Sequence, residues 1–343
     1  MKKLLATTAL VSLVAVSAAN AETKISGNLA ISYMASSEDL TSASTGSWNA
    51  FGKETQINIS NSGDLNNGMK YAAGFSWELD GGETMATGAG NENVYIDLIA
   101  GSTTFSLSAD HIPTINQNPT NLVGFGYVRG EGATGTSTGL YTANQGEVGS
   151  SYSFAVMQKF GGTTLTAAYA PHVGADANRD IFNGNNATSN YNTASSATSI
   201  NLTGDLGVAG LNVFVGRDQQ AKQNTTAEIT RTKYAATYKS GKFTVAAERD
   251  VYDADKTSAN EITSQSVGVA YAVSDTVSVG ATMATAERGA NSSSQGEEKT
   301  TIVAVGYNLG AVSLQVMAKD INDHNGTIGY DAQQVGFYLG TKF

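Results

Sequence analysis

Two glycine-rich strings in this 343-residue sequence could carry catalytic chemistry. Gly130–Gly135 fits the G-x-G-x-x-G pattern of dinucleotide-binding loops, and Gly135–Gly139 fits the G-x-S-x-G pattern that exposes a nucleophilic serine, here Ser137. Both patterns need a strand before them and a helix after them, and the sequence predicts neither. A chain with 38 glycines produces such strings by chance. We therefore predict no catalysis and no cofactor, with a barrel-embedded hydrolase, its base one of His111, His172 and His324, as the enzyme alternative.

A third pattern resembles a calcium-binding loop. Asp176, Asn178 and Asp180 would offer oxygen ligands at its first, third and fifth positions. However, Ile181 replaces the glycine of the sixth position, and Ala187 replaces the glutamate of the twelfth. We expect solvated loop carboxylates and keep a divalent-cation site here as a hypothesis.

The composition excludes several classes of protein. With no cysteine, the chain has no disulfide scaffold and no cysteine-based zinc site. Its formal charge of −10 argues against nucleic acid as a partner. Hydrophobic residues make up 41% of the chain, which is too much for a fully disordered protein.

Residues 1–21 have the features of a secretory signal peptide. Lys2 and Lys3 precede an apolar stretch, and Ala19-Asn20-Ala21 forms a small-residue cleavage site. The apolar stretch is shorter than the roughly 20 residues that a membrane-spanning helix needs. We expect cleavage after Ala21, which leaves residues 22–343 as the exported chain.

The exported chain alternates between apolar and polar residues with a period of two. In the segment 24–33 the odd positions are mostly apolar and the even positions small or polar, and similar segments recur to the end of the chain. A soluble sandwich rarely keeps this pattern over so long a chain, whereas a barrel with lipid outside and water inside needs it in nearly every strand. The pattern predicts an all-β protein, a transmembrane antiparallel β-barrel.

The connectors between candidate strands support this fold. We count sixteen candidate strands, and short and long connectors alternate between them. Outer-membrane barrels have short periplasmic turns and long external loops. The longest connector, His111–Glu147, is the third of the long ones, and the first is expected over Met34–Lys53. All three prolines are expected in long connectors, where no ladder hydrogen bond is lost.

The last strand is expected to close the barrel against the first, because a sheet in lipid cannot leave an edge unpaired. Its apolar face carries Val335, Phe337, Leu339 and Phe343. Outward tyrosines and phenylalanines near strand ends fit an aromatic girdle.

Four segments carry a resemblance to a known family: Glu54–Leu79, Ser151–Ala170, Ala270–Ala281 and Val335–Phe343. Through these segments, the chain resembles the sixteen-stranded trimeric porins of Gram-negative outer membranes, particularly the alphaproteobacterial type. The resemblance implies a homotrimer, a water-filled pore in each subunit and a third external loop folded inward as a constriction. It also implies contact with outer-membrane lipid and lipopolysaccharide, and with the barrel-assembly machinery through the C-terminal strand.

Charged residues of the wall and of the third loop are the candidate pore-lining and constriction residues. Family constrictions usually oppose acidic loop residues to wall arginines, but this chain has only six arginines. We therefore expect a weaker transverse field. Wall residues are chosen because they fall on the polar face of their strands, and loop residues because they lie in the third loop. The candidates are Lys70, Glu78, Asp97, Asp110, Arg129, Glu131, Glu147, Lys233, Lys239, Glu248 and Lys319.

These observations predict an outer-membrane porin for passive diffusion of small hydrophilic solutes and ions, with a weak preference for cations because the chain is acidic. A substrate-selective channel with a saturable solute site is the first alternative. A surface adhesin or structural barrel without useful conductance is the second.

Overall fold

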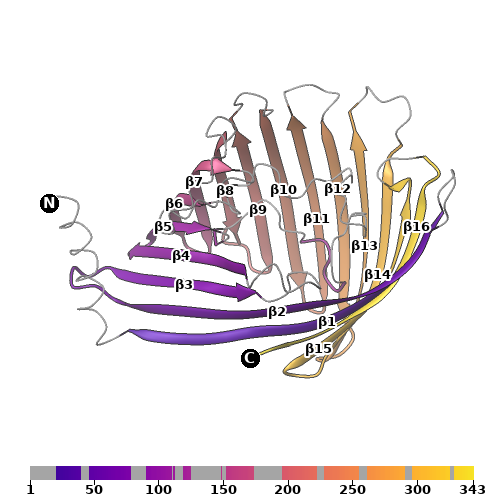
Figure 1. Cartoon of the computed structure of the whole chain (residues 1–343), viewed down its shortest axis with the longest axis horizontal. Helices are drawn as coiled ribbons and strands as arrows, with labels where there is room; N and C mark the ends of the chain where they lie inside the picture. The colour runs from indigo at the N-terminus through magenta and orange to yellow at the C-terminus, as the bar shows by residue number, and fades with distance from the viewer. Residues whose placement is uncertain are drawn as a thin grey trace.

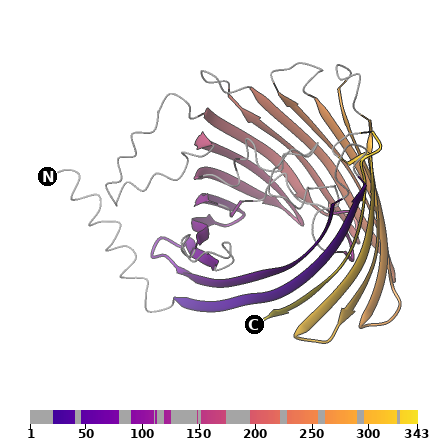
Figure 2. The same ribbon diagram turned by 45° about the vertical axis from the view of Figure 1, so that its right-hand side comes forward.

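The computed structural model describes residues 21–39, 46–78, 90–109, 111–112, 119–124, 148, 152–173, 195–221, 228–254, 261–289, 296–324 and 328–343. These residues form sixteen strands in one closed antiparallel barrel, in which each strand pairs with its neighbours in the sequence and β1 pairs with β16. Figures 1 and 2 show the strands curving around a common interior. Within the described residues, no helix is long and apolar enough to cross a membrane. The strands are β1 (Glu22–Asp39), β2 (Gly46–Asp64), β3 (Lys70–Glu78), β4 (Gly90–Ala100), β5 (Thr103–Ala109), β6 (Ser153–Phe160), β7 (Thr163–Val173), β8 (Ser195–Gly204), β9 (Leu211–Gln220), β10 (Ile229–Ser240), β11 (Phe243–Ala254), β12 (Ile262–Ala272), β13 (Val277–Arg288), β14 (Glu298–Asn308), β15 (Val312–Asn322) and β16 (Asp331–Lys342).

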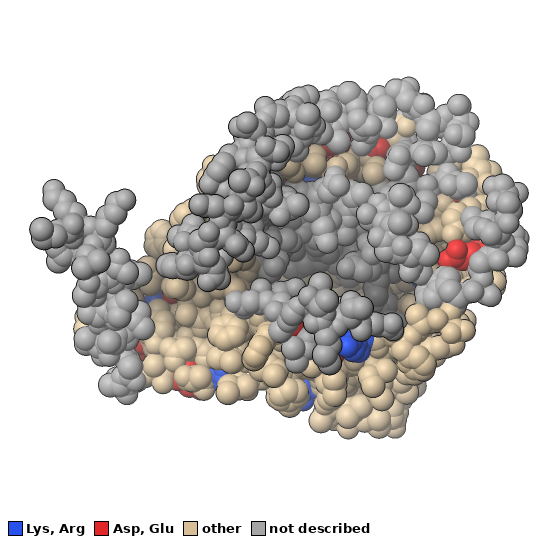
Figure 3. Space-filling view, viewed as in Figure 1, with Lys and Arg blue, Asp and Glu red and all other residues tan. Residues whose placement is uncertain are grey.

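The outer face of the barrel is apolar and the inner face is small or polar. In β14, Val303 is 57% exposed on the outer face, whereas Ala304 beside it is 3% exposed on the inner face. In Figure 3, charged side chains occupy only small, scattered patches among the described residues. Such an exposed apolar surface would be unfavourable in water. It is what the outer face of a barrel in lipid requires, so the predicted fold class is confirmed.

The tightest connections have two residues each. Gly101, Gly161 and Gly241 begin the turns after β4, β6 and β10, with φ angles of 60°, 63° and 58°. A positive φ favours glycine because it has no Cβ, and two-residue hairpin turns of this kind match the twist of the paired strands. These turns lie where the sequence predicts short connectors.

The first hairpin is longer than the sequence indicates. We expected a connector over Met34–Lys53, but β1 continues to Asp39 and β2 begins at Gly46, with Ser37 opposite Ser47. Beyond the apolar band both faces of a hairpin can meet water. The alternation of residue types therefore ends there, although the backbone pairing continues.

Pro171 is a second correction, because it lies inside β7 and not in a connector. The pairing of β7 with β8 shifts register between Ala170 and Val173. Proline lacks the N–H that a regular ladder needs, and an irregularity in the pairing tolerates that loss.

Two strands seal the barrel through their backbones. The Gly27 N–H donates to the Phe343 carbonyl oxygen at 2.8 Å, and the Phe343 N–H donates to the Gly27 carbonyl oxygen at 3.0 Å. In β16, Val335 and Leu339 are exposed on the outer face, and Phe337 stacks on Tyr33 of β1 with ring centroids 6.0 Å apart. The expected pairing of the last strand with the first is confirmed.

Candidate functional site: the interior of the barrel

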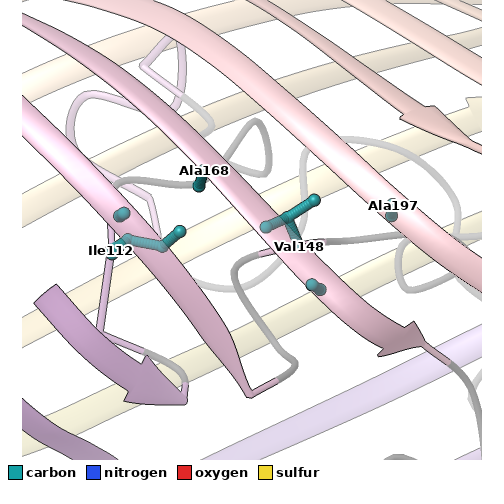
Figure 4. Packing of buried hydrophobic residues seen from close by; sticks show 6 residues of the cluster. Ile112, Val148, Ala168 and Ala197 are labelled. Carbon is teal, nitrogen blue, oxygen red and sulfur yellow. The ribbon is translucent and has the colours of Figure 1, made fainter.

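The connector between β5 and β6 is fixed to the inner wall near both of its ends. Ile112 and Val148 are 3% and 0% exposed and pack with Ala155, Ala168, Ala170 and Ala197, which are inner-face alanines of β6, β7 and β8 (Figure 4). Alanine leaves room on the wall for these larger side chains. The connector therefore starts and ends inside the barrel.

Further along the same connector, residues 119–124 lie against a different part of the wall. The Thr120 hydroxyl is hydrogen-bonded to the Ser266 hydroxyl of β12 at 2.7 Å. The Thr282 hydroxyl of β13 donates to the Thr120 carbonyl oxygen, also at 2.7 Å. Val123 packs with Ile302 of β14 and Met317 of β15. Because β12–β14 lie about opposite β5 in the ring of strands, this part of the connector has crossed the lumen.

Three glycines of the wall make this contact possible. A Cβ at Gly280 would lie 2.7 Å from a methyl group of Val123, and one at Gly306 would lie 3.2 Å from the other methyl group. A Cβ at Gly268 would collide with the Thr120 backbone. We call Gly268, Gly280, Gly306, Ser266 and Thr282 the loop seat. Apart from Tyr152, which directly precedes β6, the other residues of the connector are outside the described ranges, so the inward folding concerns 111–112, 119–124 and 148 only.

A second sector of the inner wall, on β10 and β11, carries paired charges. Arg231 donates to both carboxylate oxygens of Asp250, with its shortest contact 2.6 Å, and the Lys233 Nζ lies 3.2 Å from the Glu248 carboxylate. All four side chains are almost completely buried. Both pairs are diagonal across the ladder, since Lys233 is directly opposite Asp250. We call these four residues the paired-charge wall.

The predicted wall residue Asp97 lies beside the root of the connector. Its carboxylate is 3.4 Å from His111 Nε2, and the His111 ring stacks on Tyr95 with centroids 3.6 Å apart and planes 5° apart. Tyr95 in turn covers Gly74 of β3, where a Cβ would lie 2.8 Å from its ring. A polar group on the wall therefore orients the first residues of the connector.

The inner face of β1–β3 carries carboxylates bound to amides. Asn28 donates to Glu54 at 2.7 Å, and Gln56 donates to Glu78 at 2.9 Å. Asn28, Glu54 and Gln56 border a hollow of about 850 Å³ that extends to Tyr338 of β16 and Gln315 of β15. This hollow is open, and charged groups of both signs line it, from Glu54, Asp275 and Lys342.

The other predicted residues fall into two groups. Lys70 and Lys239 are exposed near the short turns, and Lys70 lies 3.8 Å from Asp64, whereas Lys319 is buried on the inner face of β15. The described residues do not include Asp110, Arg129, Glu131, Glu147, Ser137, Asp176, Asn178 and Asp180. Among those described, no group of three or more potential metal ligands comes together.

Sequence reasoning missed half of the paired-charge wall. Lys233 and Glu248 were predicted, but Arg231 and Asp250 were not. Each missed residue lies two positions from a predicted one on the same strand, and so on the same face. The parity rule, continued along each strand, would have found both.

A closed barrel of sixteen strands, apolar outside and polar inside, with a connector crossing its lumen, defines a membrane channel of the porin type. The sequence model described as Gram-negative porin matches residues 6–326. The chain therefore belongs to the Gram-negative porin family.

Solved structures share the fold at low sequence identity, and no curated protein matches the sequence. An anion-selective porin from Comamonas acidovorans has a TM-score of 0.68 at 15% identity, covering 94% of this chain and 100% of that one. OmpT of Vibrio cholerae has a TM-score of 0.62 at 10% identity, covering 94% of this chain and 98% of that one. A variant of Rh. blastica porin has 0.60 at 13% identity, covering 94% and 100%.

Family and fold together define the function and the location. The protein is an outer-membrane channel for passive diffusion. This family and fold are typical of channels without enzymatic activity.

Proposed function

We propose that small hydrophilic solutes and ions pass through the lumen beside a constriction formed by the connector between β5 and β6. The contact that carries this proposal is that of Thr120 and Val123 with the loop seat, across the lumen from the root of the connector. A segment held at both walls narrows the water-filled path and so limits the size of the solute. Conductance of the purified protein in planar bilayers tests the proposal, and liposomes that admit no small sugar would refute it.

We propose a weak preference for cations. Arg231 and Lys233 each form an ion pair with a carboxylate. Glu54, by contrast, accepts a hydrogen bond from an amide, and Asp97 lies beside a histidine. These two carboxylates have no Lys or Arg partner among the described residues, and so leave negative potential in the lumen. A reversal potential measured across a potassium chloride gradient is expected to have the sign of cation selectivity. The sign of anion selectivity would refute this point alone.

A channel selective for one class of solute is the second candidate. The observation in its favour is the hollow beside Glu54, Gln56 and Tyr338, where several hydrogen-bonding groups face one space. Such a site would saturate, and one solute would block single-channel current at low concentration. Flux that stays proportional to concentration for every solute would favour general diffusion.

The remaining features are proposed from the sequence together with the family. Residues 1–21 act as a cleaved signal peptide, so N-terminal sequencing of the membrane form should begin at Glu22. The subunits assemble as a homotrimer, in line with OmpT of Vibrio cholerae, a structural neighbour described in a trimer form. Lipopolysaccharide surrounds the barrel, and the assembly machinery binds the C-terminal strand. The channel works without catalysis, cofactor or metal.

A further inference from the structure

Two arginines lie on the outer face of the barrel. Arg217 of β9 and Arg249 of β11 both belong to the exposed positions of their strands, alternating with the buried inner residues Asp218 and Asp250. Both lie in the half of the strand that leads to a long connector, which is the external half of an outer-membrane barrel. Val215, Val245 and Val267 on the same face are exposed and apolar. The two arginines therefore lie on the external side of these apolar residues.

The pairing of the strands places the two arginines on one patch. Arg217 is opposite Thr232 of β10, and Thr232 is opposite Val251, two residues beyond Arg249. With strands about 4.8 Å apart and a rise of about 3.4 Å per residue, the two Cα atoms are roughly 12 Å apart. Tyr234, 51% exposed, lies between them as the partner of Arg249. Two guanidinium groups and a phenol thus share one area of the outer face.

Neither arginine has an acidic pairing neighbour among the described strands. The pairing neighbours of Arg217 are Ile200 and Thr232, and those of Arg249 are Tyr234 and Gln265, none of which is acidic. Within the part of the chain that the structure describes, neither guanidinium makes a hydrogen bond or an ion pair. Arg231 on the inner face of the same sheet, by contrast, donates to both oxygens of Asp250.

An unpaired charge on a lipid-facing strand is unfavourable, and its cost falls toward the interface, where it can reach an anion. At that level the available anions are the phosphates of lipid headgroups. Arginine suits them, because its planar group donates two parallel hydrogen bonds to one phosphate. Tyrosine at the same level places its ring beside acyl chains and its hydroxyl in the polar layer.

We propose that Arg217 and Arg249, with Tyr234 between them, bind the phosphate-bearing headgroup of an outer-leaflet lipid. The site fixes one lipid at the border of β9–β11 and holds this part of the wall at a constant depth in the membrane. It is separate from the lumen, and it does not rest on the constriction proposed above.

The test is lipid retention by the purified full-length protein, measured by native mass spectrometry with diphosphorylated lipid A as the probe. The same glycolipid without its phosphates is the control ligand. The Arg217→Gln/Arg249→Gln variant is expected to bind lipid A at least about tenfold more weakly. Loss of a hydrogen bond to a charged group typically weakens binding by at least this factor. Lys242→Gln, at a short turn on the other rim, is the matched control and should bind as the unchanged protein does.

Two further arms keep the result interpretable. Arg217→Lys/Arg249→Lys keeps the charge without the paired donors, and should lie between the unchanged protein and the glutamine variant even if the latter assembles poorly. Channel conductance should be unchanged in all variants. Equal retention of lipid A by the glutamine variant would overturn the proposal. So would displacement of lipid A by inorganic phosphate at similar concentration, because the site would then be one for free anions.

Discussion

The loop seat and the paired-charge wall are two sectors of the same inner surface, built from neighbouring strands, but they hold their contents by different forces. On β12–β14 the wall presents glycines and hydroxyl groups beside the apolar side chain of Ile302, and the connector is held by close packing and two hydrogen bonds. On β10 and β11 four long charged side chains are neutralised within the wall itself. One sector thus positions the connector, and the other keeps its four charges neutralised within the wall.

Breaking the paired-charge wall should have the largest effect. Asp250→Asn leaves the Arg231 guanidinium buried without its carboxylate, and removing one partner of a buried pair typically costs about 3–5 kcal/mol of unfolding free energy. Urea unfolding followed by tryptophan fluorescence measures this loss. The reversal potential should also move toward anions, because a negative charge is removed.

The matched control removes both charges. Arg231→Met/Asp250→Leu removes both partners of this pair and should lose far less stability than Asp250→Asn. Equal urea midpoints for Asp250→Asn and the unchanged protein would mean that the Asp250 carboxylate does not stabilise Arg231.

Filling the loop seat should have an intermediate effect. The side chain introduced by Gly280→Val would overlap Val123, and overpacking of a fitted contact costs about 1–3 kcal/mol. The segment 119–124 should move away from the wall, so single-channel conductance should change while the charge of the lumen does not. Ala281→Val, on the outer face of the same strand between the exposed Val269 and Val303, is the control. An identical change in both variants would argue against the seat.

Removing one hydrogen bond of the seat should have the smallest effect. Thr282→Val keeps the shape of the side chain but removes the donor to the Thr120 carbonyl oxygen, at a cost of about 1 kcal/mol. Thermal unfolding and open-channel current noise should both register the looser segment. Thr300→Val on β14 is the matched control, because its hydroxyl has no hydrogen-bond partner among the described residues. Noise that rises equally in both variants would contradict the assigned role.

The period of two predicted the strands because lipid outside and water inside impose it on every span. It ceased to help in the first hairpin, where the paired residues Ser37 and Ser47 lie beyond the apolar band. Parity also placed Lys233 and Glu248 on the inner face. It could not show that Arg231 binds Asp250 diagonally, because that choice depends on the register between β10 and β11. The loop seat was out of reach for the same reason: Gly268, Gly280 and Gly306 come together only when three strands are aligned.

The contacts of Thr120 join parts of the chain that lie far apart in the sequence. Its partners Ser266 and Thr282 follow it in the chain by 146 and 162 residues. Contacts of such high sequence separation form late, because the entropy of a long stretch of chain must be lost before the contact can stabilise the fold. Segment 119–124 therefore cannot make these contacts until β12 and β13 have formed. The lumen is therefore narrowed late in assembly, and a sheet that lacks the C-terminal strands would still have an unobstructed interior.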